Sequence, residues 1–94
     1  MRDANETRAM VEYLQKVRSL VTSLNDTLDA SEHAEVEHYI DHNEIGEALR
    51  LLAWIIVEHD KRISAAALAK LREYADGLVK PQDMPPGLDE HVDP

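Results

Sequence analysis

A regular apolar repeat runs through the first third of the chain. Apolar residues recur there in alternating steps of four and three positions, which places their side chains along one stripe of an α-helix. They are Met10, Leu14, Val17, Val21, Leu24 and Leu28. The pattern predicts a helix over residues 6–28 that packs into a helical bundle, with a homodimer seam as the alternative.

A second, shorter helix is predicted over residues 31–42. Its apolar side is narrow and consists of Val36, Tyr39 and Ile40. Ser31 is a favourable N-cap residue, and acidic side chains close to it suit the positive end of a helix. We expect the pair His42-Asn43 to end the helix.

The widest apolar arc follows, over residues 44–60, and predicts the central helix of the fold. At 100° per residue, four apolar side chains cluster on one side of this helix. They are Ile45, Leu49, Leu52 and Ile56. Gly46, in the first turn, permits close approach of another backbone segment. Trp54 falls on the opposite, charged stripe.

The last predicted helix begins after Ser64, which is a good N-cap residue, and Ile63 can contact Leu68 across this cap. Gly77 fits a C-terminal cap. The sequence beyond Lys80 holds every proline of the chain and many acidic residues. We expect this tail to be disordered.

Together these elements predict an all-α fold, a compact antiparallel bundle of about four helices. The bundle would form a single domain over residues 1–80. The disordered, proline-rich and acidic tail would cover residues 81–94.

Composition limits the possible functions of this 94-residue chain. It contains no cysteine, so disulfides and thiolate zinc sites are excluded. Charged residues interrupt the first ten positions, where a signal peptide would have a continuous apolar region. The longest apolar run is far shorter than the roughly 20 residues of a membrane helix. We therefore predict a soluble, cytoplasmic protein that needs no cofactor.

The charge balance points to the kind of partner. The net charge is −9, which would repel nucleic acid and anionic membranes and would attract a basic protein. No Lys or Arg lies between Arg18 and Arg50, whereas eight acidic residues do. They are Asp26, Asp29, Glu32, Glu35, Glu37, Asp41, Glu44 and Glu47. Such a segment is either an ordinary solvated face or a docking surface for a basic partner.

Metal binding and catalysis are the two alternatives to protein binding. Glu35, His38 and His42 would share one side of a helix, and two histidines four positions apart are a known zinc spacing. However, the HExxH pattern is absent, and surface histidines explain the same residues. No catalytic nucleophile, phosphate-binding loop or acid in an apolar setting is evident. We therefore predict no catalytic residue, no metal site and no enzymatic activity.

Trp54 has two interpretations. Another segment could cover it, whether the first helix, the last helix or the tail. Alternatively, it could be an exposed aromatic anchor surrounded by charge, as is typical of protein-binding hot spots. Tyr39, at the edge of the acidic helix, could act in the same way.

The stretch from Glu35 to Leu78 resembles the Maf-type immunity family, small proteins of bacterial toxin–immunity systems. The similar positions span an apolar–aromatic start, a helix with the Ala-Leu-x-x-Leu part of the family's Glu-x-Ala-Leu-x-x-Leu pattern, where this chain has Gly46 in place of the Glu, and a final Leu-rich helix. They are Val36, Tyr39, Ile40, His42, Asn43, Glu44, Gly46, Ala48, Leu49, Leu52, Ile63, Leu68 and Leu71. The resemblance covers about half of the chain, and the tail has no counterpart in it.

The resemblance implies a protein that binds and neutralises a cognate toxin. It also implies that this toxin is a nuclease-type domain, since the toxins of the family are often nucleases. From the residues themselves we expect only a basic protein partner, bound through an acidic band with two aromatic anchors. The partner-binding residues would be Glu35, Glu37, Tyr39, Asp41, Glu44, Glu47 and Trp54. The alternative is a structural or regulatory helical module that self-associates through the first helix and Trp54, as a homodimer.

Overall fold

The computed structural model of the chain describes residues 4–93, and α-helices form most of them. The four α-helices are α1 (Ala4–Ser23), α2 (Ala30–Asp41), α3 (Ile45–Glu58) and α4 (Ala65–Ala75). Two 3₁₀ turns follow, η1 (Pro81–Asp83) and η2 (Leu88–His91). The all-α class is therefore confirmed. Residues 1–3 and 94, which belong to the predicted domain and tail, lie outside the described part.

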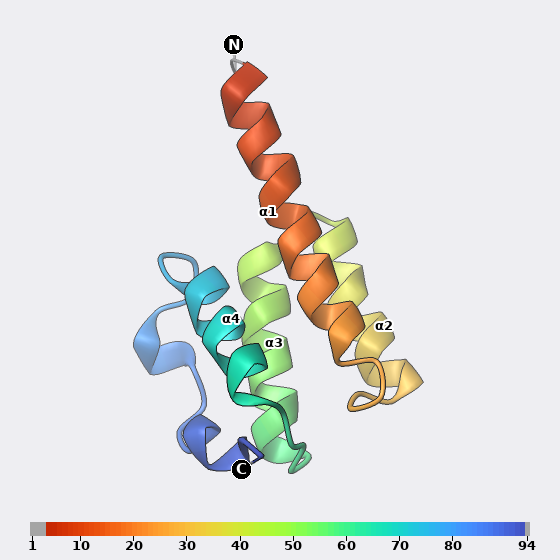
Figure 1. Cartoon of the computed structure of the whole chain (residues 1–94), viewed down its shortest axis with the longest axis vertical. Helices are drawn as coiled ribbons and strands as arrows, with labels where there is room; N and C mark the ends of the chain where they lie inside the picture. The colour runs from red at the N-terminus through yellow and green to blue at the C-terminus, as the bar shows by residue number, and fades with distance from the viewer. Residues whose placement is uncertain (1–3, 94) are drawn as a thin grey trace.

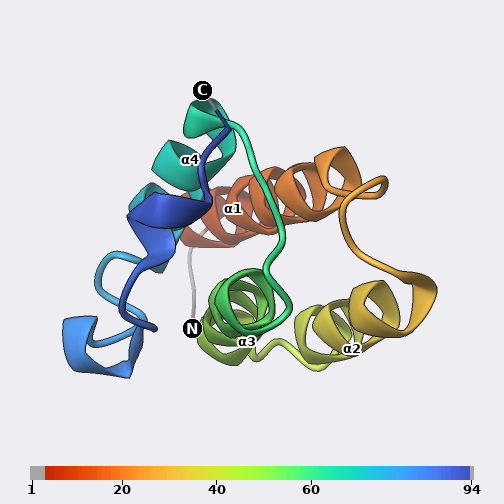
Figure 2. The same cartoon turned by 90° about the horizontal axis from the view of Figure 1, so that it is seen from below.

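The helices are arranged around α3 (Figures 1 and 2). In Figure 1, α1 and α3 run downward and α2 and α4 run upward. Figure 2 shows α2 and the C-terminal segment on opposite sides of α3. The side chains of Leu49, Leu52 and Ile56 have no exposed surface at all, as expected for the helix with the widest apolar arc.

The apolar stripe of α1 is only partly buried. Val17 and Val21 belong to the core, whereas the first half of α1 projects beyond the other helices (Figure 1) and leaves Met10 38% and Val11 47% exposed. The helix also ends at Ser23, earlier than predicted, because Asn25 and Asp26 favour turns over helix.

The predicted break at Asn43 and the predicted cap at Ser64 are confirmed, whereas the predicted cap at Ser31 is wrong. Asn43 adopts a left-handed φ of 59° between α2 and α3, and the Ser64 hydroxyl accepts a 3.0 Å hydrogen bond from the amide of Ala67. The N-cap of α2, however, is Asp29 and not Ser31. The Asp29 carboxylate accepts a 2.8 Å hydrogen bond from the amide of Glu32, which closes a capping box.

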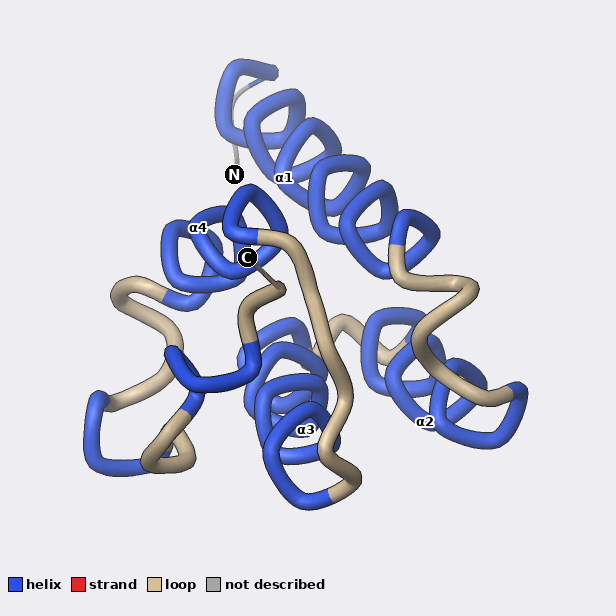
Figure 3. The backbone as a smooth tube through the Cα atoms, turned by 60° about the horizontal axis from the view of Figure 1, so that its bottom comes forward, coloured by secondary structure: helices blue, strands red, loops and turns tan. Residues whose placement is uncertain are grey.

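The prediction of a disordered tail is wrong for residues 81–93, which pack against the helices. Leu88 is only 3% exposed, and η2 contacts α3. The amide of Ile63 donates to the carbonyl of His91 at 3.0 Å, and the amide of Asp93 donates to the carbonyl of Ile63 at 2.9 Å. Figure 3 shows these two stretches side by side near the start of α4. The prolines permit 3₁₀ turns and extended backbone, and the few apolar residues between them are enough to hold the segment in place.

Gly77 provides a test of how α4 ends. Its φ is +82°, and the amide of Leu78 beyond it donates to the carbonyl of Ala75 at 2.9 Å. Replacing Gly77 with Ala is expected to lower the free energy of unfolding by about 1 kcal/mol, because an L side chain disfavours this conformation. Urea unfolding measures the loss.

Gly77→Asn is the matched control and should lower the free energy of unfolding by less, since Asn tolerates the left-handed region better. Equal losses for the two variants would contradict the backbone explanation.

Candidate protein-binding surface

The predicted acidic band lies on α2 and on the first turns of α3, but the helical twist of α2 divides it. Glu37 and Asp41 face α1, where Arg18 meets both carboxylates, at 2.9 and 2.8 Å. Glu35 lies on a different side of α2 and is exposed. The band is therefore two surfaces rather than one continuous face.

Arg18 neutralises part of the acidic segment. Its hydrogen bond with Asp41 is the main reason that the pKa of the Arg18 guanidinium lies above its usual value. At the other end of the segment, Arg50 pairs with Glu47 at 3.1 Å. The pair of Arg50 with Glu47 follows from their spacing of three positions on one helix, whereas the contacts of Arg18 with α2 join distant residues and could not be predicted from spacing.

Two carboxylates of the band remain open. Glu35 and Glu44 are exposed, and neither forms an ion pair within 4.0 Å with any residue whose side chain the structure describes. Together with the exposed Asp41 and Glu47, they present carboxylates from α2 and α3 to solvent. A basic partner could neutralise Glu35 and Glu44 without first displacing a described internal cation.

Tyr39 is half-buried and packs against the core. Its ring also meets the ring of His38 edge to face, with centroids 5.8 Å apart. Its carbonyl accepts a 2.8 Å hydrogen bond from the amide of Glu44, which joins the end of α2 to the start of α3. Tyr39 therefore offers a partner only part of its surface.

Trp54 is also half-buried, and the C-terminal segment reaches it. The indole N–H donates a 2.9 Å hydrogen bond to the carbonyl of Asp83 in η1. Of the two sequence interpretations, the structure thus shows that the tail meets Trp54, with part of the ring surface still accessible.

Glu32 joins the start of α2 to the residues that follow α3, a role that the sequence did not predict. Its carboxylate is buried and accepts hydrogen bonds from the amide of Asp29, at 2.8 Å, and from Lys61, at 2.9 Å, and it is also in contact with Nδ1 of His59. Burial by itself would raise the pKa of Glu32, but these contacts outweigh it and lower the pKa to about 2. The spacing of Asp29 and Glu32, typical of a capping box, was the available signal.

The histidines considered for a metal site contact each other. The ring centroids of His38 and His42 are 4.2 Å apart, with the rings tilted by 45°, and Nδ1 of His42 donates to the carbonyl of His38 at 2.8 Å. Among the side chains that the structure describes, no three His, Asp or Glu residues are grouped in a way that could hold a metal ion.

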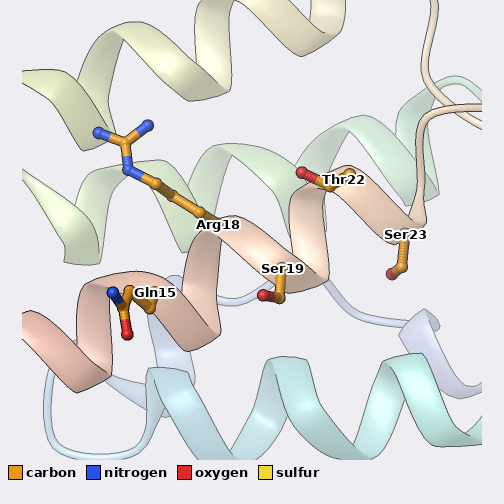
Figure 4. A pocket seen from close by; sticks show the side chains of 5 residues that line it. All are labelled: Gln15, Arg18, Ser19, Thr22 and Ser23. Carbon is orange, nitrogen blue, oxygen red and sulfur yellow. The ribbon is translucent and has the colours of Figure 1, made fainter.

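A hollow of about 660 Å³ lies on α1 (Figure 4). Its lining comes from that one helix, and the side chains diverge: Arg18 points toward α2, whereas Ser19 points away from it. The hydroxyl of Ser23 donates to the carbonyl of Leu20 at 2.6 Å. The lining therefore does not bring a nucleophile and a general base together.

Comparisons with known proteins add no relative. Scans against protein-family models, curated proteins and solved structures each gave no match. Among residues 4–93, the structure contains no helix with the length and apolar character needed to cross a membrane.

Proposed function

We propose that this protein is an immunity protein, which binds a basic, nuclease-type toxin domain through its acidic surface and neutralises it in the cytoplasm. The observation that carries the proposal is the open carboxylates Glu35 and Glu44 on a chain of net charge −9. The resemblance of the α2–α4 sequence to the Maf-type immunity family supports the same function.

Physical reasoning favours such a partner. Clustered carboxylates speed association with a basic protein and fix its orientation, more than they add affinity. The half-buried edges of Tyr39 and Trp54 can add apolar contact at low entropic loss, because both rings are already held by neighbouring residues. Binding needs no chemistry in the protein, only occupation of the toxin surface that would hold nucleic acid.

The proposal is tested by capture from the native lysate at low and at high salt, with bound proteins identified by mass spectrometry. One basic protein in equal amount, partly released by salt, is expected, and it should lose its toxic activity when the complex forms. Recovery of no basic partner, from a lysate shown to contain the toxin, would refute the proposal.

Charge reversal on the band gives a quantitative prediction. Glu35→Lys and Glu44→Lys, made separately, are each expected to weaken binding of the captured partner about tenfold at low salt and less at high salt. Calorimetry or surface plasmon resonance measures the change. Glu73→Lys on α4 is the matched control, with the same charge change at an exposed position outside the band. Equal affinities for all three variants would remove the band from the proposal.

Self-association remains a second candidate function, because the projecting half of α1 exposes apolar side chains at Met10 and Val11. A dimer formed there would bury a stripe that the other helices leave uncovered. If this dimer forms, the melting temperature should rise with protein concentration. A monomer throughout the micromolar range would exclude it.

A further inference from the structure

A groove of about 450 Å³ lies where the start of α3 meets the segment that follows α4. Three parts of the chain line it: the turn and first helical turns around Glu44 and Glu47, the loop at Leu78, and η1 at Asp83. In Figure 1 the start of α3 and the end of α4 lie next to each other, at a similar height. The groove thus depends on the C-terminal segment being folded.

Leu78 provides accessible apolar surface in the lining of the groove, and this part of the lining is termed the floor. Leu78 is 52% exposed, one of the few large apolar side chains that the described part of the chain leaves open. Gly46 lets the two walls approach, because a Cβ atom built there would lie 3.2 Å from the carbonyl oxygen of Leu78. Leu78 therefore lies directly against the first turn of α3.

Three acidic residues, Glu44, Glu47 and Asp83, also belong to the lining, and this part of it is termed the rim. Arg50, which pairs with Glu47, is the one cation in the lining. Lys80, next to Val79 along the chain, is exposed and does not line the groove. Because Arg50 pairs with Glu47, the negative charges of Glu44 and Asp83 remain unneutralised within the lining, next to the apolar side chain of Leu78.

Trp54 holds one side of this rim in place. Its indole N–H donates to the carbonyl of Asp83 at 2.9 Å, which fixes η1 beside α3. Trp54 thereby becomes a positioning residue for Asp83, in addition to any contact that it makes itself.

We infer that this groove receives a protein segment that presents an Arg or Lys side chain next to an apolar one. The apolar side chain would cover Leu78, and the cation would lie between Glu44 and Asp83. An apolar side chain alone would leave Glu44 and Asp83 without a cation, and a cation alone would leave Leu78 exposed. The inference rests on the proposed function for its natural occupant, since the segment would belong to the basic partner.

The test uses a defined probe, N-acetyl-leucyl-arginine amide, titrated into the ¹⁵N-labelled full chain. We expect saturable amide shifts, with a Kd in the millimolar range, concentrated on residues 43–47 and 78–83. N-acetyl-leucyl-glutamine amide should bind at least about fivefold more weakly, because it lacks the cation. Shifts spread evenly over distant acidic residues, no shifts, or equal binding of the two peptides would each overturn the inference.

Matched variants separate the floor from the rim. Leu78→Gln should weaken binding of the arginine peptide about fivefold or more, whereas Val11→Gln, at a similarly exposed position on α1, should leave it unchanged. Glu44→Gln with Asp83→Asn should abolish the preference for arginine over glutamine, and Glu12→Gln with Glu73→Gln should keep it. Melting temperatures of the variants show that the fold is intact. Loss of binding in the control variants would contradict the groove.

Failure of the groove and failure of the proposed function have different signatures. If the peptide does not bind the groove but Glu35→Lys still weakens the captured toxin, the function stands and the contact lies elsewhere on the band. If the peptide binds but the lysate yields no basic partner, the groove stands and the immunity function falls.

Discussion

Leu88→Ala is expected to lower the free energy of unfolding by about 3 kcal/mol. Leu88 is only 3% exposed, and truncating a buried Leu removes its apolar transfer energy and leaves a cavity. Urea unfolding followed by circular dichroism measures the loss. A disordered tail would instead leave stability unchanged, so the variant also decides whether residues 81–93 belong to the folded domain.

Leu78→Ala is the matched control for Leu88. It removes the same atoms from a side chain that is 52% exposed, so we expect a loss below about 0.5 kcal/mol. Similar losses for the two leucines would mean that the C-terminal segment does not bury Leu88 in solution.

Glu32→Gln is expected to destabilise the protein by about 2 kcal/mol at pH 7. The substitution removes the charge that holds Lys61 and His59 to the start of α2 and leaves an amide that cannot replace all of its hydrogen bonds. Glu35→Gln, the same change at an exposed position of the same helix, is the control and should change stability by less than about 0.5 kcal/mol.

The effect of Glu32 depends on pH in a defined direction. Its pKa is lower in the folded chain, about 2, than the ordinary 4.5 of the unfolded chain. The carboxylate therefore contributes its full stabilisation above pH 4.5 and loses it as the pH falls toward about 2. Urea unfolding at pH 7 and pH 3 should show the difference between wild type and Glu32→Gln falling to less than about half. An unchanged difference at pH 3 would exclude the lowered pKa as its source.

Periodicity predicted the helices because local spacing decides them. The buried side chains of α3 and the cap at Ser64 follow from residues within a few positions of each other. The fold class, the central position of α3 and the helix breaks at Asn43 and Gly77 could therefore be read from the sequence.

What the sequence did not predict depends on contacts between distant residues. Arg18 meets Glu37 and Asp41, and Lys61 meets Glu32, across separations that helical spacing does not constrain. The prolines and acidic residues of the tail predict disorder, but Leu88, Met84 and Val92 pack against the core and the backbone near His91 pairs with Ile63, which is far away in sequence. The placement of the acidic side chains, and the groove beside Leu78, required the three-dimensional arrangement.

The projecting half of α1 gives that helix a gradient of local stability. Its first turns depend on intrinsic helix propensity, because neither Met10 nor Val11 is buried, and an isolated helix end frays readily in water. From Val17 onward, opening the helix would expose the core and approach the cost of global unfolding. Opening the first turns of α1 would therefore leave Val17 in the core and Arg18 paired with α2, so a contact at Met10 and Val11 could form or break without moving the open carboxylates of Glu35 and Glu44.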